Sequence, residues 1–395
     1  MSKPLVVIYI TIVLDAVGIG LIFPILPSLL QEVTHADNVA SALGIMTALY
    51  AAMQFVCAPV LGSLSDRLGR RPLLLVSLAG ATVNYVFLAF ASDLWTLLLG
   101  RAIAGITSAN VSVATAYITD ISAEEERARR FGLLNAMFGL GFIIGPVLGG
   151  TLGDHWLRLP FVVAAVLNGC NLLLAQATLP ESHAPSREPI EIAVLNPLRP
   201  LRWAFSVKSL LPIVAVFFLF SATGEAYGVC WALWGGDTFR WSGLWIGLSL
   251  GAFGVCQTLA QAFLPGPAVR LLSERGAILT GVAGVCIALT ALAFANQSWM
   301  VFAIMPLFAL GGIGAPALQS IATRHVDGHL QGQLQGVLAS TVSLASIIAP
   351  LGFSGVYFVV REQWPGAIWL SVVAIYILIV PVVLSLRPTK PNSGF

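Results

Sequence analysis

Three ionisable side chains lie inside long apolar stretches of this sequence: Asp15, Arg101 and Glu225. A charge at the centre of a bilayer costs about 2.5 to 3.5 kcal/mol on insertion scales, so each of these residues needs a specific reason to be there. Asp15 and Glu225 can bind and release a proton, whereas Arg101 stays charged and needs water, a carboxylate or carbonyl oxygens around it. We predict that these three residues couple proton movement to another process.

The composition indicates which kind of protein holds these charges. Of 395 residues, 57% are apolar and 10% are charged, whereas an average soluble domain has about 25% charged residues. Apolar runs of about 18 to 25 residues recur twelve times, and a helix of that length crosses a bilayer. The sequence therefore predicts an all-α membrane protein with twelve transmembrane helices.

A polar, proline-containing stretch divides the chain. We predict a cytoplasmic linker at residues 181–209, between a six-helix half at 1–180 and a second six-helix half at 210–395. Most lysines and arginines fall in the loops of one side, whereas the other side holds Arg158, Arg240 and Arg361. Because basic residues mark the cytoplasmic side, both termini are predicted to be cytoplasmic.

A charged loop, GSLSDRLGRR, joins the second and third predicted helices and begins at Gly62. Asp66 and Arg70 have the i, i+4 spacing of an ion pair on a helix, and Gly62 leaves room for a helix of the other half. We predict that these residues, with Asp120 and Arg127 near the next cytoplasmic loop, form a latch that closes the cytoplasmic side. The alternative is a basic loop that only sets the topology.

The second half contains a similar loop, GPAVRLLSERGAIL, at the same position and beginning at Gly266. Glu274 stands where the first loop has Arg70, and Arg270 stands where it has Asp66. Duplication of a six-helix unit is expected of a transporter whose site lies between two halves. Because the charges are reversed, we expect no second latch, and chance similarity of two loops is the alternative.

The stretch GFIIGPVLGG predicts close packing of the fifth helix. Gly141, Gly145 and Gly149 leave one helix face without side chains, and Gly150 follows directly. Pro146 removes a backbone donor and bends the helix. The alternative to a role in transport is a simple packing seam.

Polar and aromatic side chains at inward-facing spacings predict a cavity for an amphipathic, partly aromatic molecule. Any single amide can instead bond a neighbouring helix. The predicted substrate-binding residues are Asn84, Ser108, Asn110, Tyr227, Trp231, Gln257, Gln261 and Gln319.

Several classes of function find no support in the sequence. We find no nucleophile and base pair, no phosphate-cradling loop and no metal-ligand spacing, so neither an enzyme, a bound cofactor nor a metal site is expected. The formal net charge of +2 gives no clustered basic face for nucleic acid.

Taken together, these motifs resemble the bacterial tetracycline efflux proteins, drug:proton antiporters of the major facilitator superfamily. The resemblance includes LDAVGIGLIFPILPSLL from Leu14, RAIAGIT from Arg101, GFIIGPVLGG and, from Gln331, QGQLQG. It implies two six-helix halves, alternating access and proton-coupled export of a tetracycline-like drug, with Mg²⁺ accompanying the drug as cargo. It also implies that GFIIGPVLGG lies where the two halves meet. We expect a monomer in the bacterial inner membrane.

The chain departs from that family at the residues that matter for coupling. The matching stretches of the exporters carry an acid where Val285 stands, a histidine at Gln257, often an acid at Asn84, and an amide at Glu225. Either coupling has moved to Glu225 or Asp15, or the substrate differs. The alternatives are therefore an exporter of another drug or metabolite, a proton-driven importer, or a transporter-like sensor.

Overall fold

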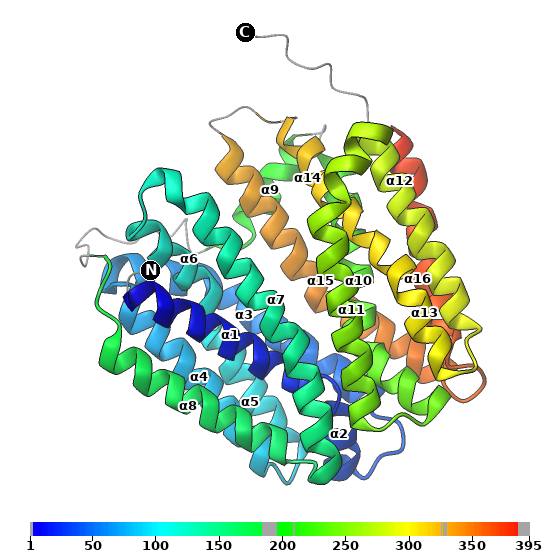
Figure 1. Ribbon diagram of the computed structural model, residues 1–395, viewed down its shortest axis with the longest axis horizontal. Coiled ribbons are helices and arrows are strands. Elements are labelled where there is room, and N and C mark those ends of the chain that lie inside the picture. Colours follow the sequence, from blue (N-terminus) through cyan, green and yellow to red (C-terminus); the bar gives the residue numbers. More distant parts are fainter. Residues whose placement is uncertain (1–2, 184–195, 208–209, 325, 327–329, 386–395) are drawn as a thin grey trace. The chain divides into compact units, whose positions relative to one another are not determined.

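The computed structural model describes residues 3–183, 196–207, 210–324, 326 and 330–385 (Figure 1). Within these ranges, 12 helical segments are long and apolar enough to cross a membrane, which confirms the predicted number. Residues 184–195 and 208–209 of the predicted linker lie outside the described residues.

The first six spans are built from seven helices, and one short helix lies between the first and second spans. The short helix is α2 (Leu26–Thr34), and α5 and α6 together make one span. The others are α1 (Lys3–Ile22), α3 (Ala40–Leu68), α4 (Arg70–Phe90), α5 (Leu94–Thr107), α6 (Asn110–Asp120), α7 (Glu124–His155) and α8 (Leu159–Thr178).

The last six spans follow the short helix α9 (Arg199–Ser206). They begin with α10 (Leu211–Phe239), α11 (Gly243–Phe263) and α12 (Pro265–Ala293). The remaining elements are α13 (Ser298–Phe308), the 3-10 turn η2 (Ala309–Ile313), α14 (Gly314–Arg324), α15 (Gln331–Val360) and α16 (Ala367–Ser385).

The chain divides into two compact units. Unit 1 comprises Met1–Pro197 with Arg240–Gly254, and unit 2 comprises Leu198–Phe239 with Val255–Phe395. The division falls inside α11, so the first half of this helix packs with unit 1. The predicted halves placed all of α11 in the second half.

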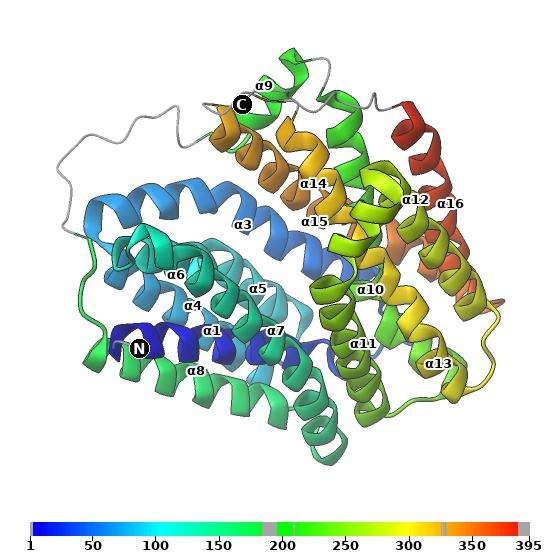
Figure 2. The same cartoon turned by 45° about the horizontal axis from the view of Figure 1, so that its top comes forward.

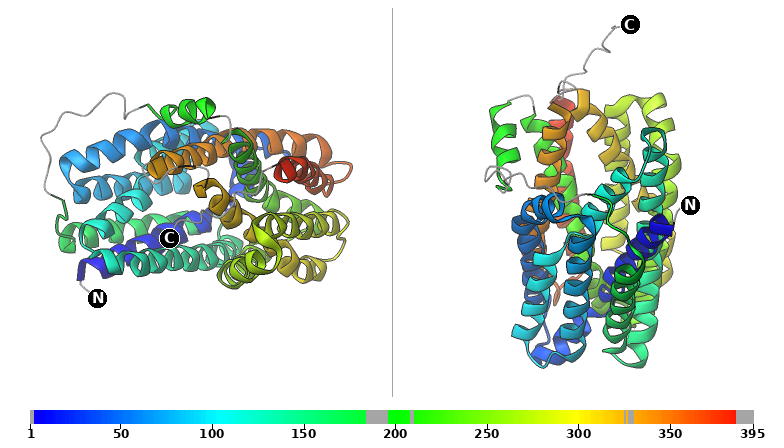
Figure 3. Two further views of the ribbon diagram at one scale, coloured as in Figure 1. Left: turned by 90° about the horizontal axis from the view of Figure 1, so that it is seen from above. Right: turned by 90° about the vertical axis from the view of Figure 1, so that its left-hand side faces the viewer.

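In unit 1, α1 lies against α7 and α8, and α4 lies against α5 and α8 (Figures 1 and 3). Apolar side chains fill the space between these helices, among them Ile8, Leu78 and Tyr117. Outside the spans, Asp93 caps the start of α5 by accepting a hydrogen bond from the Thr96 N–H at 2.9 Å. That hydrogen bond lowers the pKa of the Asp93 carboxyl.

The fourth span is interrupted, although the sequence predicted one continuous helix there. α5 ends at Thr107 and α6 begins at Asn110. Thr107 occupies the space that a Cβ on Gly80 would need, so α4 and the end of α5 approach closely at this point. The tenth span is interrupted in the same way, where η2 separates α13 from α14.

In unit 2, α10 lies against α15 and α16, and α12 lies against α14 and α16 (Figure 2). Aromatic rings fill part of this interior: Trp231 lies 5.3 Å from Trp234 and 5.6 Å from Trp369, between ring centroids. Trp231 is only 1% exposed. Its ring, predicted to line the substrate site, is here part of the packed interior.

Candidate functional site

Asp15 lies on α1 and is 7% exposed. Asn110 donates a hydrogen bond from Nδ2 to Asp15 Oδ1 at 2.7 Å. Because Asn110 is the first residue of α6, the interruption of the fourth span brings this amide to Asp15. Two predicted residues, one assigned to the proton and one to the substrate, are therefore in direct contact.

Arg101, on α5, lies with its guanidinium carbon 5.3 Å from the centre of the Tyr50 ring. The Tyr50 hydroxyl forms a hydrogen bond of 2.9 Å with Ser108 Oγ, to which Gln54 Nε2 also donates at 3.0 Å. Among the described residues Arg101 has no carboxylate ion-pair partner, so the aromatic face is its clearest cation contact. Arg101, Tyr50, Ser108 and Gln54 thus form a cluster that combines a positive charge with hydroxyl and amide groups.

Several buried polar atoms of unit 1 have no hydrogen-bond partner among the described residues. These are Nε of Arg101 and the side-chain oxygens of Asn84, Asn110 and Asn168. An unsatisfied buried polar group costs about 1–3 kcal/mol. Asn168 Nδ2 lies 3.1 Å from the position of a Cβ on Gly18, three residues after Asp15. The three asparagine oxygens can accept hydrogen bonds from water or a polar ligand, and Arg101 Nε can donate one.

Unit 2 holds Glu225, the second carboxylate that the sequence predicted inside a span. Ser346, on α15, donates a hydrogen bond of 2.5 Å to Glu225 Oε1 on α10. Glu225 is half-buried. Sequence reasoning found Glu225 from its charge, but it did not identify Ser346, because a serine in a transmembrane helix carries no distinctive signal.

The predicted amide residues of unit 2 lie in two places. Gln257 and Gln261 lie against Gly312, where an added Cβ would come within 2.7 Å of Gln257 Nε2. Gln319 donates instead to Gln335 at 3.3 Å. Val285 is 1% exposed and lies against Gly311, so the side chain at this departure from the family is a packed apolar group.

Tyr227 lies on α10, two residues after Glu225. Its ring centroid lies 4.6 Å from that of Trp231 and 5.8 Å from that of Phe308 on α13. The ring of this predicted substrate-binding residue therefore packs both against the aromatic interior of unit 2 and against α13, the first part of the interrupted tenth span.

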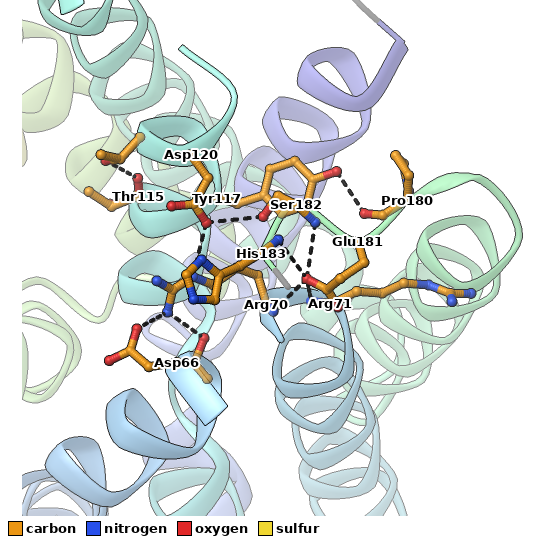
Figure 4. A network of polar contacts seen from close by, with 12 residues as sticks. Asp66, Arg70, Arg71, Thr115, Tyr117, Asp120, Pro180, Glu181, Ser182 and His183 are labelled. Carbon is orange, nitrogen blue, oxygen red and sulfur yellow. Dashed lines mark hydrogen bonds and ion pairs between the residues drawn. The ribbon is translucent and has the colours of Figure 1, made fainter. Parts of the chain in front are cut away.

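Arg70 is the centre of the charged cluster between the end of α3 and the start of α4 (Figure 4). Its Nη1 lies 2.5 Å from Asp66 Oδ1, and its Nε lies 3.1 Å from Asp120 Oδ2. Ser65 Oγ accepts from the same Nη1 at 3.1 Å. The Arg70 side chain is 11% exposed, whereas that of Asp66 is 64% exposed. The predicted i, i+4 pair is present and extends to Asp120.

Glu181 completes this cluster and was missed by the sequence reasoning. Its Oε1 accepts from the Arg70 N–H at 2.7 Å, and its Oε2 accepts from the Arg71 N–H at 3.2 Å (Figure 4). The carboxylate thereby satisfies backbone donors at the start of α4. The sequence feature that could have indicated Glu181 is an acidic residue directly after the sixth span, on the cytoplasmic side predicted for the basic loop at Arg70 and Arg71.

Two other predicted latch residues do not join Arg70. Within unit 1, a Cβ on Gly62 would meet no atom within 4 Å. Arg127 Nε is buried without a hydrogen-bond partner in the described part of the chain. Its neighbour Arg130 instead contacts the loop after α6, with 3.0 Å from Nη1 to the Ile121 carbonyl oxygen.

The glycines of α7 form two contact faces. A Cβ on Gly141 would lie 2.6 Å from the Val13 carbonyl oxygen, and one on Gly145 would lie 2.7 Å from that of Val17. Gly149 continues this face against Leu21. The predicted bare face therefore packs on α1.

The second face of α7 contacts the first half of α11. Gly150 lies against Gly243, and Pro146 lies against Gly247. Asp154, at the end of α7, accepts hydrogen bonds from the backbone N–H groups of Gly243 at 2.8 Å and Leu244 at 3.0 Å. The α11 segment assigned to unit 1 is thus held by both close packing and a carboxylate cap.

Replacing Asp154 with alanine is expected to destabilise this seam by about 1 kcal/mol, because two N-terminal donors of α11 lose their acceptor. Thermal unfolding of the purified protein in detergent should show a midpoint lowered by about 2 °C. Asp154→Asn keeps an acceptor oxygen and serves as the control. Equal midpoints for the wild type and Asp154→Ala would contradict the capping role.

A metal centre is not evident in the part of the chain that the structure describes: no group of three or more His, Cys, Asp or Glu side chains could hold an ion there.

Comparison with known proteins identifies relatives along the whole chain. A model of the Major Facilitator Superfamily matches residues 8–233 and 226–395. The class C tetracycline resistance protein of Escherichia coli is 48% identical over 380 residues, covering 96% of this chain and 96% of the relative. The class G protein of Vibrio anguillarum is 42% identical, covering 93% of this chain and 94% of the relative.

Solved structures share the fold at low identity. The human organic anion transporter MFSD10 (TETRAN) aligns with a TM-score of 0.69 at 23% identity, covering 96% of this chain and 99% of that chain. The nucleoside transporter NupG aligns with a TM-score of 0.79 at 13% identity, covering 99% and 100%. These similarities confirm the expected architecture.

Proposed function

Because the chain belongs to the major facilitator superfamily, we propose that it is a proton-coupled antiporter that exports a tetracycline-like drug. It is a multi-pass protein of the bacterial inner membrane. The observation that carries the proposal is the 48% identity, over nearly the whole of both chains, with a tetracycline resistance protein. The polar groups around Asp15 and Arg101 supply chemistry that such a protein needs.

In the proposed cycle, the two halves rock about a central site and expose it to each side in turn. Asp15 or Glu225 takes up a proton from the periplasmic side and releases it to the cytoplasm. Asn110 donates to Asp15, and Ser346 donates to Glu225. Protonation turns one oxygen of the carboxyl group into an O–H donor that needs an acceptor, while the other oxygen can still accept. Protonation therefore changes the hydrogen-bond network around the site.

The proposed substrate contacts in unit 1 are Ser108 and the amide oxygens of Asn84 and Asn110, which have no hydrogen-bond partner among the described residues. Tetracyclines carry several hydroxyl groups and a carboxamide, and the hydrogens of these groups can be donated to such oxygens. Mg²⁺ travels, in this proposal, with the drug as cargo. Arg101 keeps a positive charge beside the site and thereby sets proton and substrate in competition. In unit 2, we propose Gln257, Gln261, Gln319 and Tyr227 as further substrate contacts.

A second candidate is the export of a different drug or metabolite. Val285 and Gln257 favour it, because the tetracycline exporters carry an acid and a histidine at these positions. Neither side chain here can carry a proton near neutral pH. In both candidates the acidic coupling groups are Asp15 and Glu225.

The cluster around Arg70 is proposed as the cytoplasmic latch. Asp66 is the most exposed member and Arg70 the most buried of this ion-pair group. Asp66 is therefore placed to exchange partners as the protein changes state, while Arg70 and Asp120 keep the anchor fixed.

Drug susceptibility and vesicle transport test the function. Cells that express the protein should tolerate more tetracycline, and everted vesicles should accumulate tetracycline with Mg²⁺ when a pH gradient is imposed. Collapse of the gradient should stop accumulation. Transport of another drug class without any of tetracycline would favour the second candidate, and uptake unaffected by the gradient would exclude proton coupling.

A further inference from the structure

The short helix α9 lies outside the spans, and its two faces differ. Leu201 and Ala204 are 9% and 2% exposed and point inward, where α9 packs on α15 and also contacts α10 (Figure 2). Arg199, Arg202 and Phe205 are exposed on the opposite face, and Phe205 is 70% exposed. The face turned away from α15 and α10 thus carries two positive charges beside a large aromatic ring.

The two arginines of this face have no counter-charge in the part of the chain that the structure describes. Neither the Arg199 nor the Arg202 guanidinium belongs to an ion pair there. The helix itself, RPLRWAFS, contains no acidic residue. Basic residues near a membrane surface are attracted to anionic lipid headgroups. The charge of both arginines is therefore available to an anionic partner.

α9 meets α15 at the depth of the membrane surface. α15 has 30 residues, and at ~1.5 Å per residue it is about 45 Å long, whereas the hydrocarbon core of a bilayer is about 30 Å thick. Centring α15 in the bilayer places the core at roughly residues 336–355. A Cβ on Gly336 would lie 3.5 Å from Pro200 Cγ, so α9 touches α15 at the edge of this range. The helix therefore lies where the lipid headgroups begin.

The tryptophans of the chain give an independent indication of this depth. Nine of the ten lie on the predicted periplasmic side, in the outer halves of spans or in the loops between them. The tenth is Trp203, and it lies on α9. Tryptophan is enriched at both membrane–water interfaces, because its ring is apolar and its N–H is polar. The single tryptophan on the predicted cytoplasmic side thus indicates that α9 is an interfacial element.

We infer that the exposed face of α9 binds the anionic phospholipids of the cytoplasmic leaflet. Arg199 and Arg202 contact lipid phosphates at the level of the headgroups, and Phe205 inserts its ring at the boundary with the acyl chains. Phosphatidylglycerol and cardiolipin have this chemistry. This contact with lipid is independent of whether the protein exports a tetracycline-like drug.

Hydrogen exchange of the full-length protein tests this lipid contact. The protein is placed in vesicles of phosphatidylcholine alone and in vesicles that contain about one third phosphatidylglycerol. Backbone amides of residues 199–206 should exchange about tenfold more slowly in the anionic vesicles, the order expected of two arginines at an anionic surface. About 0.5 M NaCl should remove most of this difference, because salt screens exposed charges.

Three variants separate the parts of the contact. Arg199→Gln combined with Arg202→Gln should exchange at the same rate in both kinds of vesicle, because the charges are gone. Phe205→Ser should exchange faster than wild type in both, since the apolar part of the contact is lost. Arg129→Gln is the matched control: Arg129 is exposed on α7, close to three glutamates in the first turn of that helix, and its variant should keep the wild-type difference.

Equal exchange of wild-type α9 in neutral and anionic vesicles would overturn the inference, and that comparison requires no variant. A double arginine variant that keeps the wild-type difference would also overturn it. Protection by inorganic phosphate in neutral vesicles would assign the arginines to a free anion. Protection that increases with the number of protein copies per vesicle would assign the face to a second copy of the chain. Either of these results rejects lipid binding.

Discussion

Asp15→Asn is expected to lower proton-driven drug accumulation about 100-fold or more, the scale of effect of a lost proton-transfer group. Asparagine has nearly the shape of aspartate and can still contact Asn110, which now donates to Asp15 at 2.7 Å. It cannot bind and release a proton. The variant should therefore fold and reach the membrane while losing the response to an imposed pH gradient in everted vesicles.

Exchange of labelled for unlabelled drug without a gradient separates the two roles proposed for Asp15. Retained exchange assigns Asp15 to the proton, whereas lost exchange assigns it to the drug site. Asp93→Asn is the matched control, because Asp93 caps α5 outside the spans and asparagine also caps helices well. Full gradient-driven accumulation by Asp15→Asn would remove Asp15 from the coupling pathway.

Glu225→Gln, measured beside Asp15→Asn, decides how the two carboxylates share the work. Ser346 donates to Glu225 at 2.5 Å, and glutamine retains an acceptor oxygen for it. If only one of the two variants loses the gradient response, that residue carries the proton. Loss in both means that each carboxylate is needed in the cycle.

The spans could be predicted from the sequence because a bilayer imposes a length and a composition on every crossing helix. The interruption between Thr107 and Asn110 could not. No proline lies there, and the end of α5 lies in close contact with Gly80 on α4, which is a tertiary feature. The same holds for the turn at Ser273 inside α12, where φ is 65°, because a serine rarely adopts this conformation.

The charged residues of the candidate site could be predicted from the sequence, but their hydrogen-bond partners could not. Asp15 and Glu225 stand out because a charge in an apolar run is costly. Asn110 and Ser346 are each one of many polar residues in the spans, and only the packing of separate helices brings them to those carboxylates. Trp231 was assigned to the substrate from its inward-facing spacing, and its side chain is 1% exposed and packs in the interior of unit 2. Its assignment to the substrate stays a prediction.

Gly145→Leu is expected to prevent stable folding of unit 1. A Cβ at this position would already lie 2.7 Å from the Val17 carbonyl oxygen and 2.8 Å from Gly20 Cα, so a leucine must push α7 away from α1. Overpacking costs about 1–3 kcal/mol where side chains can adjust, and here the neighbours are backbone atoms that cannot. The amount of protein in the membrane and its thermal midpoint in detergent should both fall sharply.

Gly139→Leu is the matched control. Gly139 lies on the same helix as Gly145, and a Cβ there would meet nothing within 4 Å. Equal loss in both variants would mean that leucine disturbs α7 itself and not its contact with α1. Gly145→Ala separates packing from transport. If it reaches the membrane in normal amounts but transports more slowly than Gly139→Ala, the approach of α7 to α1 has a role in the cycle beyond stability, because α1 also carries Asp15.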